Sequence, residues 1–127
     1  MEKLTKKEIL QKEKFNDLYQ KLITGDYILL GKFKEITTDE DIAYAGHIFK
    51  HTNDNIFSKS FGKSYFHWQH YGSSSCDKTK KSLKWAITEI FDDCDYFAIM
   101  GNNEYYAATD RYYTEQWEIQ NKQLQEA

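Results

Sequence analysis

All four histidines of this chain fall within 24 residues and form two short pairs. His47 and His51 are four positions apart, and His67 and His70 are three positions apart. On a helix, an i, i+4 pair places two imidazoles on one face, at a separation that Zn²⁺ or another divalent ion can bridge. The second pair could complete the coordination sphere, as a metal-dependent enzyme would require. The four histidines are therefore a candidate metal site.

Two observations favour the alternative, in which the histidines are solvated or capping residues and the protein uses no cofactor. No acid lies between His47 and His51 in the manner of the H-E-x-x-H motif. On a strand, His67 and His70 would also point to opposite faces.

A Gly-Ser turn followed by lysines is the second group that could do chemistry. Residues 72–82 read GSSSCDKTKKS and lie between a predicted strand and a predicted helix. Lysines at a helix N-terminus oppose its dipole, whereas hydroxyls, ammonium groups and free N–H groups together could seat a phosphate or carboxylate. The candidate anion-binding residues are Ser73, Ser74, Ser75, Lys78, Lys80, Lys81 and Lys84. The alternative is a solvated basic turn in which Asp77 or Ser75 caps the helix.

The two cysteines have weaker signals. Cys76 lies beside the basic helix start, where a thiolate would be favoured, but a Cys-His hydrolase would also need His67 or His70 within reach of it. Cys94 lies in the run DDCD over residues 92–95, at the wrong end of a predicted helix for negative charge. That run indicates a metal ion or a basic partner, with a solvated charge run as the alternative.

Aromatic residues are unusually frequent, with ten Tyr, eight Phe and three Trp among 127 residues. Tyrosine doublets lie in the last third, where residues 85–127 carry nine acids against two basic residues. Tyr and Trp supply large, stiff contact area at low entropic cost, so their surplus indicates a recognition surface. The candidate partner-binding residues are Tyr105, Tyr106, Tyr112, Tyr113, Glu115, Trp117 and Glu118. A tyrosine-rich core is the alternative.

Basic charge gathers in the middle of the chain, where residues 59–84 carry six Lys against one acid. This segment could bind nucleic acid or a phosphate ligand, with Tyr65, His67 and Tyr71 stacking on bases. A pI near 5.8 and a single Arg among seventeen basic residues oppose nucleic-acid binding. The basic and acidic blocks could also pair between two copies, so the partners to consider are a protein, nucleic acid and a second copy of the chain.

The elements expected to position these groups are four helices and four strands. Apolar periodicity predicts helices over residues 4–24, 38–51, 77–92 and 110–125, strands over 26–33 and 63–71, and a hairpin over 95–100 and 104–109. The order α-β-α-β-α-β-β-α predicts one α+β domain over residues 1–127, with a mostly antiparallel sheet and helices on one face. The first helix, thinly apolar in its first half, is expected to be peripheral.

Composition bounds the class of protein. No window approaches about 18 uninterrupted apolar residues, so no membrane span is expected. Two cysteines and a polar start predict free thiols in the cytoplasm. The excess of Lys over Arg and the absence of Pro are typical of AT-rich coding sequences, such as those of low-GC bacteria and their phages.

We therefore expect a small non-catalytic protein whose aromatic, acidic surface binds and inhibits or modulates another macromolecule. Its size and composition are typical of phage or mobile-element anti-defence inhibitors of the anti-CRISPR or anti-restriction type, although the chain carries no motif of such a family.

Overall fold

The chain folds around one open, six-stranded antiparallel sheet, which confirms the α+β class. The computed structural model describes residues 1–52 and 64–126. The strands are β1 (Glu2–Thr5), β2 (Tyr27–Lys32), β3 (Gly46–Thr52), β4 (Ser64–Gln69), β5 (Ser73–Cys76) and β6 (Tyr96–Gly101), in the spatial order β1-β6-β2-β3-β4-β5. The helices are α1 (Lys6–Ile9), α2 (Lys12–Ile23), α3 (Asp39–Tyr44), α4 (Lys80–Trp85), which continues into a π-helical turn η1 (Ala86–Ile90), and α5 (Asn102–Glu126).

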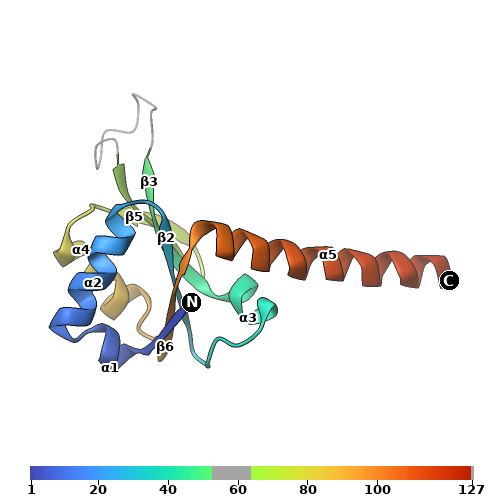
Figure 1. The fold of residues 1–127 in the computed structure, drawn as a ribbon, viewed down its shortest axis with the longest axis horizontal. Coiled ribbons are helices and arrows are strands. Elements are labelled where there is room, and N and C mark those ends of the chain that lie inside the picture. Colours follow the sequence, from blue (N-terminus) through green and yellow to red (C-terminus); the bar gives the residue numbers. More distant parts are fainter. Residues whose placement is uncertain (53–63, 127) are drawn as a thin grey trace.

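One face of the sheet packs against α1, α2, α4 and η1 (Figure 1). Thr5 begins α1 with a capping box, because its hydroxyl accepts from the Glu8 N–H and the Glu8 carboxylate accepts from the Thr5 N–H. Leu18 and Leu22 of α2 are fully buried in this larger core. The N-terminal helical segment is therefore part of the core rather than peripheral.

The opposite face of the sheet packs against α3 and the first turns of α5 (Figure 1). The residues of β2 from Ile28 to Gly31 are all buried, so this strand needs cover on both faces. Ile42 of α3 and Ala108 of α5 supply that cover in a second, smaller apolar cluster. The expectation that helices cover a single face is therefore corrected to two covered faces.

Strand number is the second correction, since the sheet has six strands where about four were expected. The predictions for β2, β4 and β6 are confirmed within a few residues. The helix expected over 38–51 ends at Tyr44 because Ala45 turns to an extended conformation, and residues 46–52 pair between β2 and β4 as β3. The Gly-Ser segment forms the edge strand β5 in place of a loop.

The hairpin expected after residue 95 is the third correction. β6 pairs with β1 on one side and β2 on the other, so its hydrogen bonds need no returning strand. Residues 104–109 are instead the first turns of α5, a helix of 25 residues. The helix predicted over 110–125 is the remainder of that element.

α5 leaves the body of the protein part-way along its length and extends away from it (Figure 1). Its buried residues are Ala108 and Tyr112, and Arg111 donates two hydrogen bonds to the Asp39 carboxylate of α3. Within the described chain, no side chain from position 114 to 126 makes a hydrogen bond, ion pair or ring contact with another element.

Two expectations fall wholly or partly on residues 53–63, outside the described ranges: the turn-rich segment after Thr52 and the first part of the basic segment 59–84. Among the described helices, none is both long enough and apolar enough to cross a bilayer.

Candidate functional site

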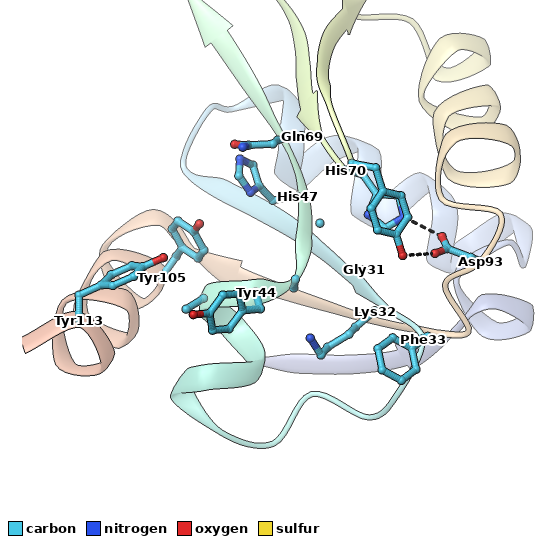
Figure 2. Close-up of a pocket in the computed structure, with 14 residues that line it drawn as sticks. Gly31, Lys32, Phe33, Tyr44, His47, Gln69, His70, Asp93, Tyr105 and Tyr113 are labelled. Atoms are coloured by element: carbon cyan, nitrogen blue, oxygen red, sulfur yellow. Dashed lines mark hydrogen bonds and ion pairs between the residues drawn. The ribbon is translucent and has the colours of Figure 1, made fainter. Parts of the chain in front are cut away.

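A cleft of about 460 Å³ opens where the ends of β2 and β4 and the start of β3 meet α3 and α5. Tyr44, Tyr105 and Tyr113 form one wall, and His70 and Asp93 lie on the opposite side (Figure 2). The remaining lining residues are Gly31, Lys32, Phe33, Ala43, Ala45, Gly46, His47, Gln69 and Tyr71. The cleft is therefore walled by aromatic rings and carries ionisable groups from β2, from β3 and from the segments that follow β4 and η1.

Two glycines that pair across β2 and β3 create the space beneath this cleft. Gly31 and Gly46 lie opposite each other in the register. A Cβ on Gly46 would come within 2.5 Å of His70 Nδ1 and 2.7 Å of the Phe91 ring, and one on Gly31 would lie 2.7 Å from Phe91. The two rings can lie directly on the sheet backbone because both positions lack a side chain.

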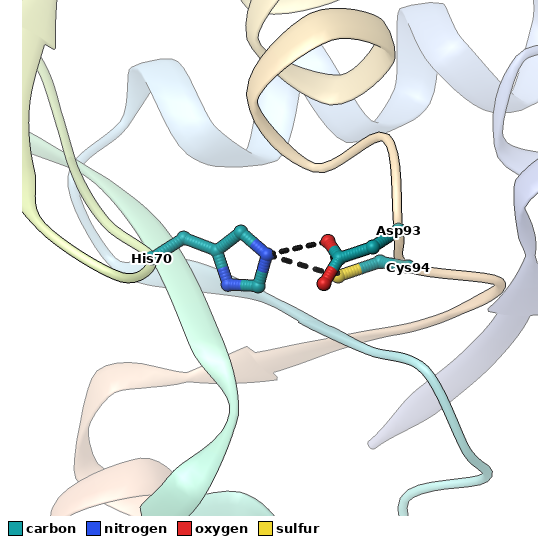
Figure 3. Close-up of side chains that lie close together, drawn as sticks. All are labelled: His70, Asp93 and Cys94. Carbon is teal, nitrogen blue, oxygen red and sulfur yellow. Dashed lines mark hydrogen bonds and ion pairs between the residues drawn. The ribbon is translucent and has the colours of Figure 1, made fainter.

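His70 is the centre of a hydrogen-bonded group on one side of the cleft. Its imidazole Nε2 lies 2.6 Å from Asp93 Oδ1 and 3.7 Å from Cys94 Sγ (Figure 3). The ring stacks on Phe91 with a centroid distance of 4.6 Å and an interplanar angle of 10°. Tyr71 OH donates to Asp93 Oδ2 at 2.7 Å. Two separate segments, residues 70–71 and 91–94, thus fix one another.

The electrostatics of this group are set by burial and by the Asp93 carboxylate. Desolvation alone would raise the pKa of Asp93, but hydrogen bonds from His70 and Tyr71 hold it below its usual range. Burial, reinforced by Asp93, raises the pKa of Cys94 to about 12, so in the protein alone this side chain is a neutral thiol. Cys94 is consequently no ready nucleophile.

Tyr71 has the one positive φ value, 59°, among the described non-glycine residues. This conformation is unfavourable for a bulky side chain and persists only where surrounding contacts hold it. Here the contacts are the hydrogen bond to Asp93 and a ring contact with His70 at 4.3 Å. The backbone strain therefore coincides with the His70 group at the rim of the cleft.

A search of family models, of curated proteins and of solved structures finds no match to this chain.

The rim of the cleft and the outer face of α5 form one aromatic surface. Phe33, Tyr44, Tyr71 and Tyr113 line the cleft and are all exposed. From Tyr113 (55% exposed) the surface continues along α5 to Trp117 (64%) and Leu124 (77%). These three residues are four and seven positions apart, the spacing that places side chains on one face of a helix.

The structure divides the predicted partner-binding residues into two groups. Tyr106, Tyr113, Trp117, Glu115 and Glu118 are exposed. Tyr112 is instead buried, and its hydroxyl donates to Tyr44 OH at 3.2 Å. Tyr105 is half-buried beside His47 in the cleft wall.

The four candidate histidines do not gather at one point. His47, His51 and His67 lie on one face of the β3-β4 pair, where Phe49 separates them with ring distances of 5.4 to 6.1 Å. His70 follows β4 on the other face, beside Phe91. The group that the structure does bring together is His70 with Asp93 and Cys94. Burial and the neighbouring His67 lower the pKa of His47, which favours its neutral form.

The candidate anion-binding residues are also separated. Lys80, Lys81 and Lys84 line a groove of about 270 Å³ together with Lys12 of α2. Ser73, Ser74 and Ser75 lie instead on the edge strand β5, and Lys78 donates to Ser64 Oγ. Thr79 caps α4 by accepting from the Ser82 N–H, so the cap is neither Asp77 nor Ser75.

The expectation of a lowered pKa at Cys76 is wrong. Cys76 is buried in the larger core, and desolvation raises the pKa of its thiol to about 11. Its hydrogen-bond contact is the Ser82 carbonyl, at 3.9 Å.

Lys32, Phe33 and Tyr44 are parts of the site that the sequence did not predict. Each of these residues lies at or just after the end of a strand or helix and belongs to no recognisable motif. Nothing in their spacing along the chain links them to His70. Asp93 and Cys94 did have a signal in the sequence. They lie in the DDCD run, whose negative charge at a helix end indicated a metal ion or a basic partner.

Proposed function

We propose that this chain is a non-catalytic interaction protein that binds another protein through α5 and the adjoining cleft. The observation that carries the proposal is the exposed row of Tyr113, Trp117 and Leu124 on a helix that extends beyond the body.

A helix segment of this kind is hard to explain without a partner. Positions 114–126 receive no side-chain support from the other described elements, and isolated helices of that length are marginal in water. Exposed Trp and Leu on one face add to the unfavourable free energy of the free state, at about 1.5–3 kcal/mol for each large apolar side chain left in water. Binding of the apolar face in a groove on another protein would support the helix and remove the exposed Trp and Leu side chains from water.

The partner that fits is a protein with an apolar groove in a basic surface. α5 carries five acids against Arg111 and Lys122, and Arg111 is already paired with Asp39. Glu115 and Glu118 are two positions and one position from Trp117, respectively, so they do not share its face. Their role in this proposal is long-range attraction, which raises the association rate rather than filling the groove. Inhibition of a host defence enzyme is one result that such binding would have.

The experiment compares capture from a host lysate by tagged wild-type protein and two variants, with and without nuclease. The first variant is Tyr113→Ala/Trp117→Ala/Leu124→Ala. The control is Trp85→Ala, which removes an exposed tryptophan of α4 outside the aromatic surface. We expect wild type and control to capture the same protein, and the purified partner to bind the triple variant at least ~100-fold more weakly.

Other outcomes would contradict the proposal. Equal capture by the triple variant would show that α5 is not the binding surface. Capture that disappears with nuclease and requires Lys80, Lys81 and Lys84 would instead establish nucleic-acid binding through the lysine groove. A dimer of the wild type that the triple variant converts to a monomer would make a second copy the occupant of α5.

A further inference from the structure

We propose that His70, Asp93 and Cys94 form a binding site for one zinc-class divalent ion, ligated by the imidazole Nε2, a carboxylate oxygen and the Cys94 sulfur. The site opens on the same cleft as the proposed partner-binding surface, across from Tyr105 and Tyr113, but the proposal of a metal site does not depend on partner binding.

The three side chains offer ligand atoms of the types that zinc takes. Nitrogen, sulfur and carboxylate oxygen bind Zn²⁺ at about 2.0–2.3 Å, so neighbouring ligand atoms in a tetrahedron lie roughly 3.4–3.6 Å apart. Cys94 Sγ lies 3.7 Å from His70 Nε2 and 3.6 Å from Asp93 Oδ1. These two distances already have the length that an ion requires.

The third distance is shorter, because a proton now bridges it. His70 Nε2 and Asp93 Oδ1 are 2.6 Å apart, so the ion needs them to separate by roughly 0.8 Å. The Asp93 side chain is 39% exposed, whereas the His70 side chain is 9% exposed and Cys94 is buried, so Asp93 is the group that moves. On binding, the thiol proton leaves to solvent and the imidazole carries its proton on Nδ1.

The side chains around the three ligands hold them as outer contacts hold the ligands of metal sites. Tyr71 OH donates to Asp93 Oδ2, the oxygen that does not bond to His70. Phe91 and the missing side chain of Gly46 fix the plane of the imidazole. The Cys94 N–H donates to the Phe91 carbonyl, which closes the turn that carries two of the ligands.

The local charge favours a cation. A thiolate and the Asp93 carboxylate would neutralise a divalent ion, and Asp95 is a further acid that acts on Cys94. Lys6 is the opposing cation, and its ammonium is bound to the Phe91 and Asp92 carbonyls at the end of the helical segment. The DDCD run places negative charge at a helix end, which is unfavourable by itself, and a bound cation would offset this charge.

Three protein ligands leave one position of the tetrahedron open. His70 and Asp93 line the 460 Å³ cleft, whereas Cys94 lies beneath them, so the open position faces the cleft. Water or a ligand from the cleft would complete the coordination.

The test is a titration of the metal-free full-length protein with Co²⁺, which reports ligand type through its absorption. We expect one Co²⁺ per chain, with visible bands of tetrahedral geometry and a thiolate-to-cobalt charge-transfer band, both removed by Zn²⁺. Cys94→Ser should abolish the charge-transfer band. Cys76→Ala, a change at the other buried cysteine, should keep it. Tyr71→Phe should weaken binding about 10-fold by loosening Asp93.

Asp93→Asn keeps the test informative if Cys94→Ser does not fold, since its side chain is partly exposed and its loss should weaken Co²⁺ binding at least ~10-fold. No saturable band with the wild type, a band that survives in Cys94→Ser, or unchanged affinity in Asp93→Asn would each overturn the proposal. A band lost in Cys76→Ala alone would place the metal elsewhere.

Discussion

Two glycines that face each other in β2 and β3 provide the space in which the side chains of the cleft meet. Gly31 and Gly46 let Phe91 and His70 lie on the sheet backbone, and that contact brings His70 within hydrogen-bond distance of Asp93. The chemistry of the site thus depends on residues that have none of their own. Their φ values are ordinary, so the requirement is for space and not for backbone freedom.

Replacing Gly46 by Ala should therefore displace both rings. The new Cβ would lie 2.5 Å from His70 Nδ1, and overpacking of this kind costs roughly 1–3 kcal/mol of unfolding free energy. We expect a melting temperature several degrees lower, measured by circular dichroism. Gly72→Ala is the control, because a Cβ there has nothing within 4 Å. Equal melting of the two variants would show that the contact over Gly46 is not tight.

At the scale of the element, α3 connects the body to α5. Thr38 begins α3 with a capping box that includes Asp41, a buried carboxylate. Desolvation would raise the pKa of Asp41, but hydrogen bonds from Thr37, Lys34 and Thr38 outweigh it and hold the pKa well below 3.8. The Arg111 pair with Asp39 and the Tyr112 contact with Tyr44 then fix α5 on α3.

Because the pKa of Asp41 is lowered in the folded protein, the free energy of unfolding should decrease as the pH falls into the acid range. The unfolded chain binds the proton near pH 3.8 and the folded chain does not, so the contribution of Asp41 is complete above that pH and is lost below it. Asp41→Asn should cost roughly 1–3 kcal/mol at pH 7 and reduce the loss of stability between pH 4 and 2. Urea unfolding at several pH values measures both, with the exposed neighbour Glu40→Gln as control. If Asp41→Asn lost as much unfolding free energy between pH 4 and 2 as the wild type, Asp41 would not be the source of this pH dependence.

For the whole molecule, the decisive feature is the separation of a folded body from an extended helix. Both apolar clusters lie around the sheet, α5 contributes Tyr105 and Ala108 to the smaller one, and the last buried residue of α5 is Tyr112. We therefore expect the body to fold without the last turns of α5, the turns to which the proposed function assigns a partner.

A chain ended after Thr114 should keep a melting temperature within a few degrees of the wild type, because the removed residues support nothing else in the described structure. It should also lose the partner that the full chain captures. Tyr112→Ala in the full chain is the opposite control, since it removes a buried contact with Tyr44 and should lower the melting temperature. A collapse of the shortened chain would show that the end of α5 belongs to the core.

Local patterns in the sequence were enough for the elements whose side chains alternate or repeat along one stretch. β4 follows from period 2, β2 and β6 from short apolar runs, and most of α2 and α5 from apolar spacing and charge. Exposure of Tyr106, Tyr113 and Trp117 also follows from the surplus of aromatic residues over what one core can hold. These features depend on neighbours within a few positions, so the sequence by itself determined them.

Tertiary structure decided what long-range pairing controls. Ile42, Ala45 and Phe49 have helical spacing, yet residues 46–52 form β3 because β2 and β4 both offer unpaired backbone groups. β6 already has two partner strands, so residues 104–109 continue as helix and not as a hairpin. His70 meets Asp93 and Cys94 across more than twenty positions because Gly46 leaves room beside Phe91. Hydrogen-bond partners and space of this kind exist only in the folded chain, which is why spacing along the sequence did not bring these three residues together.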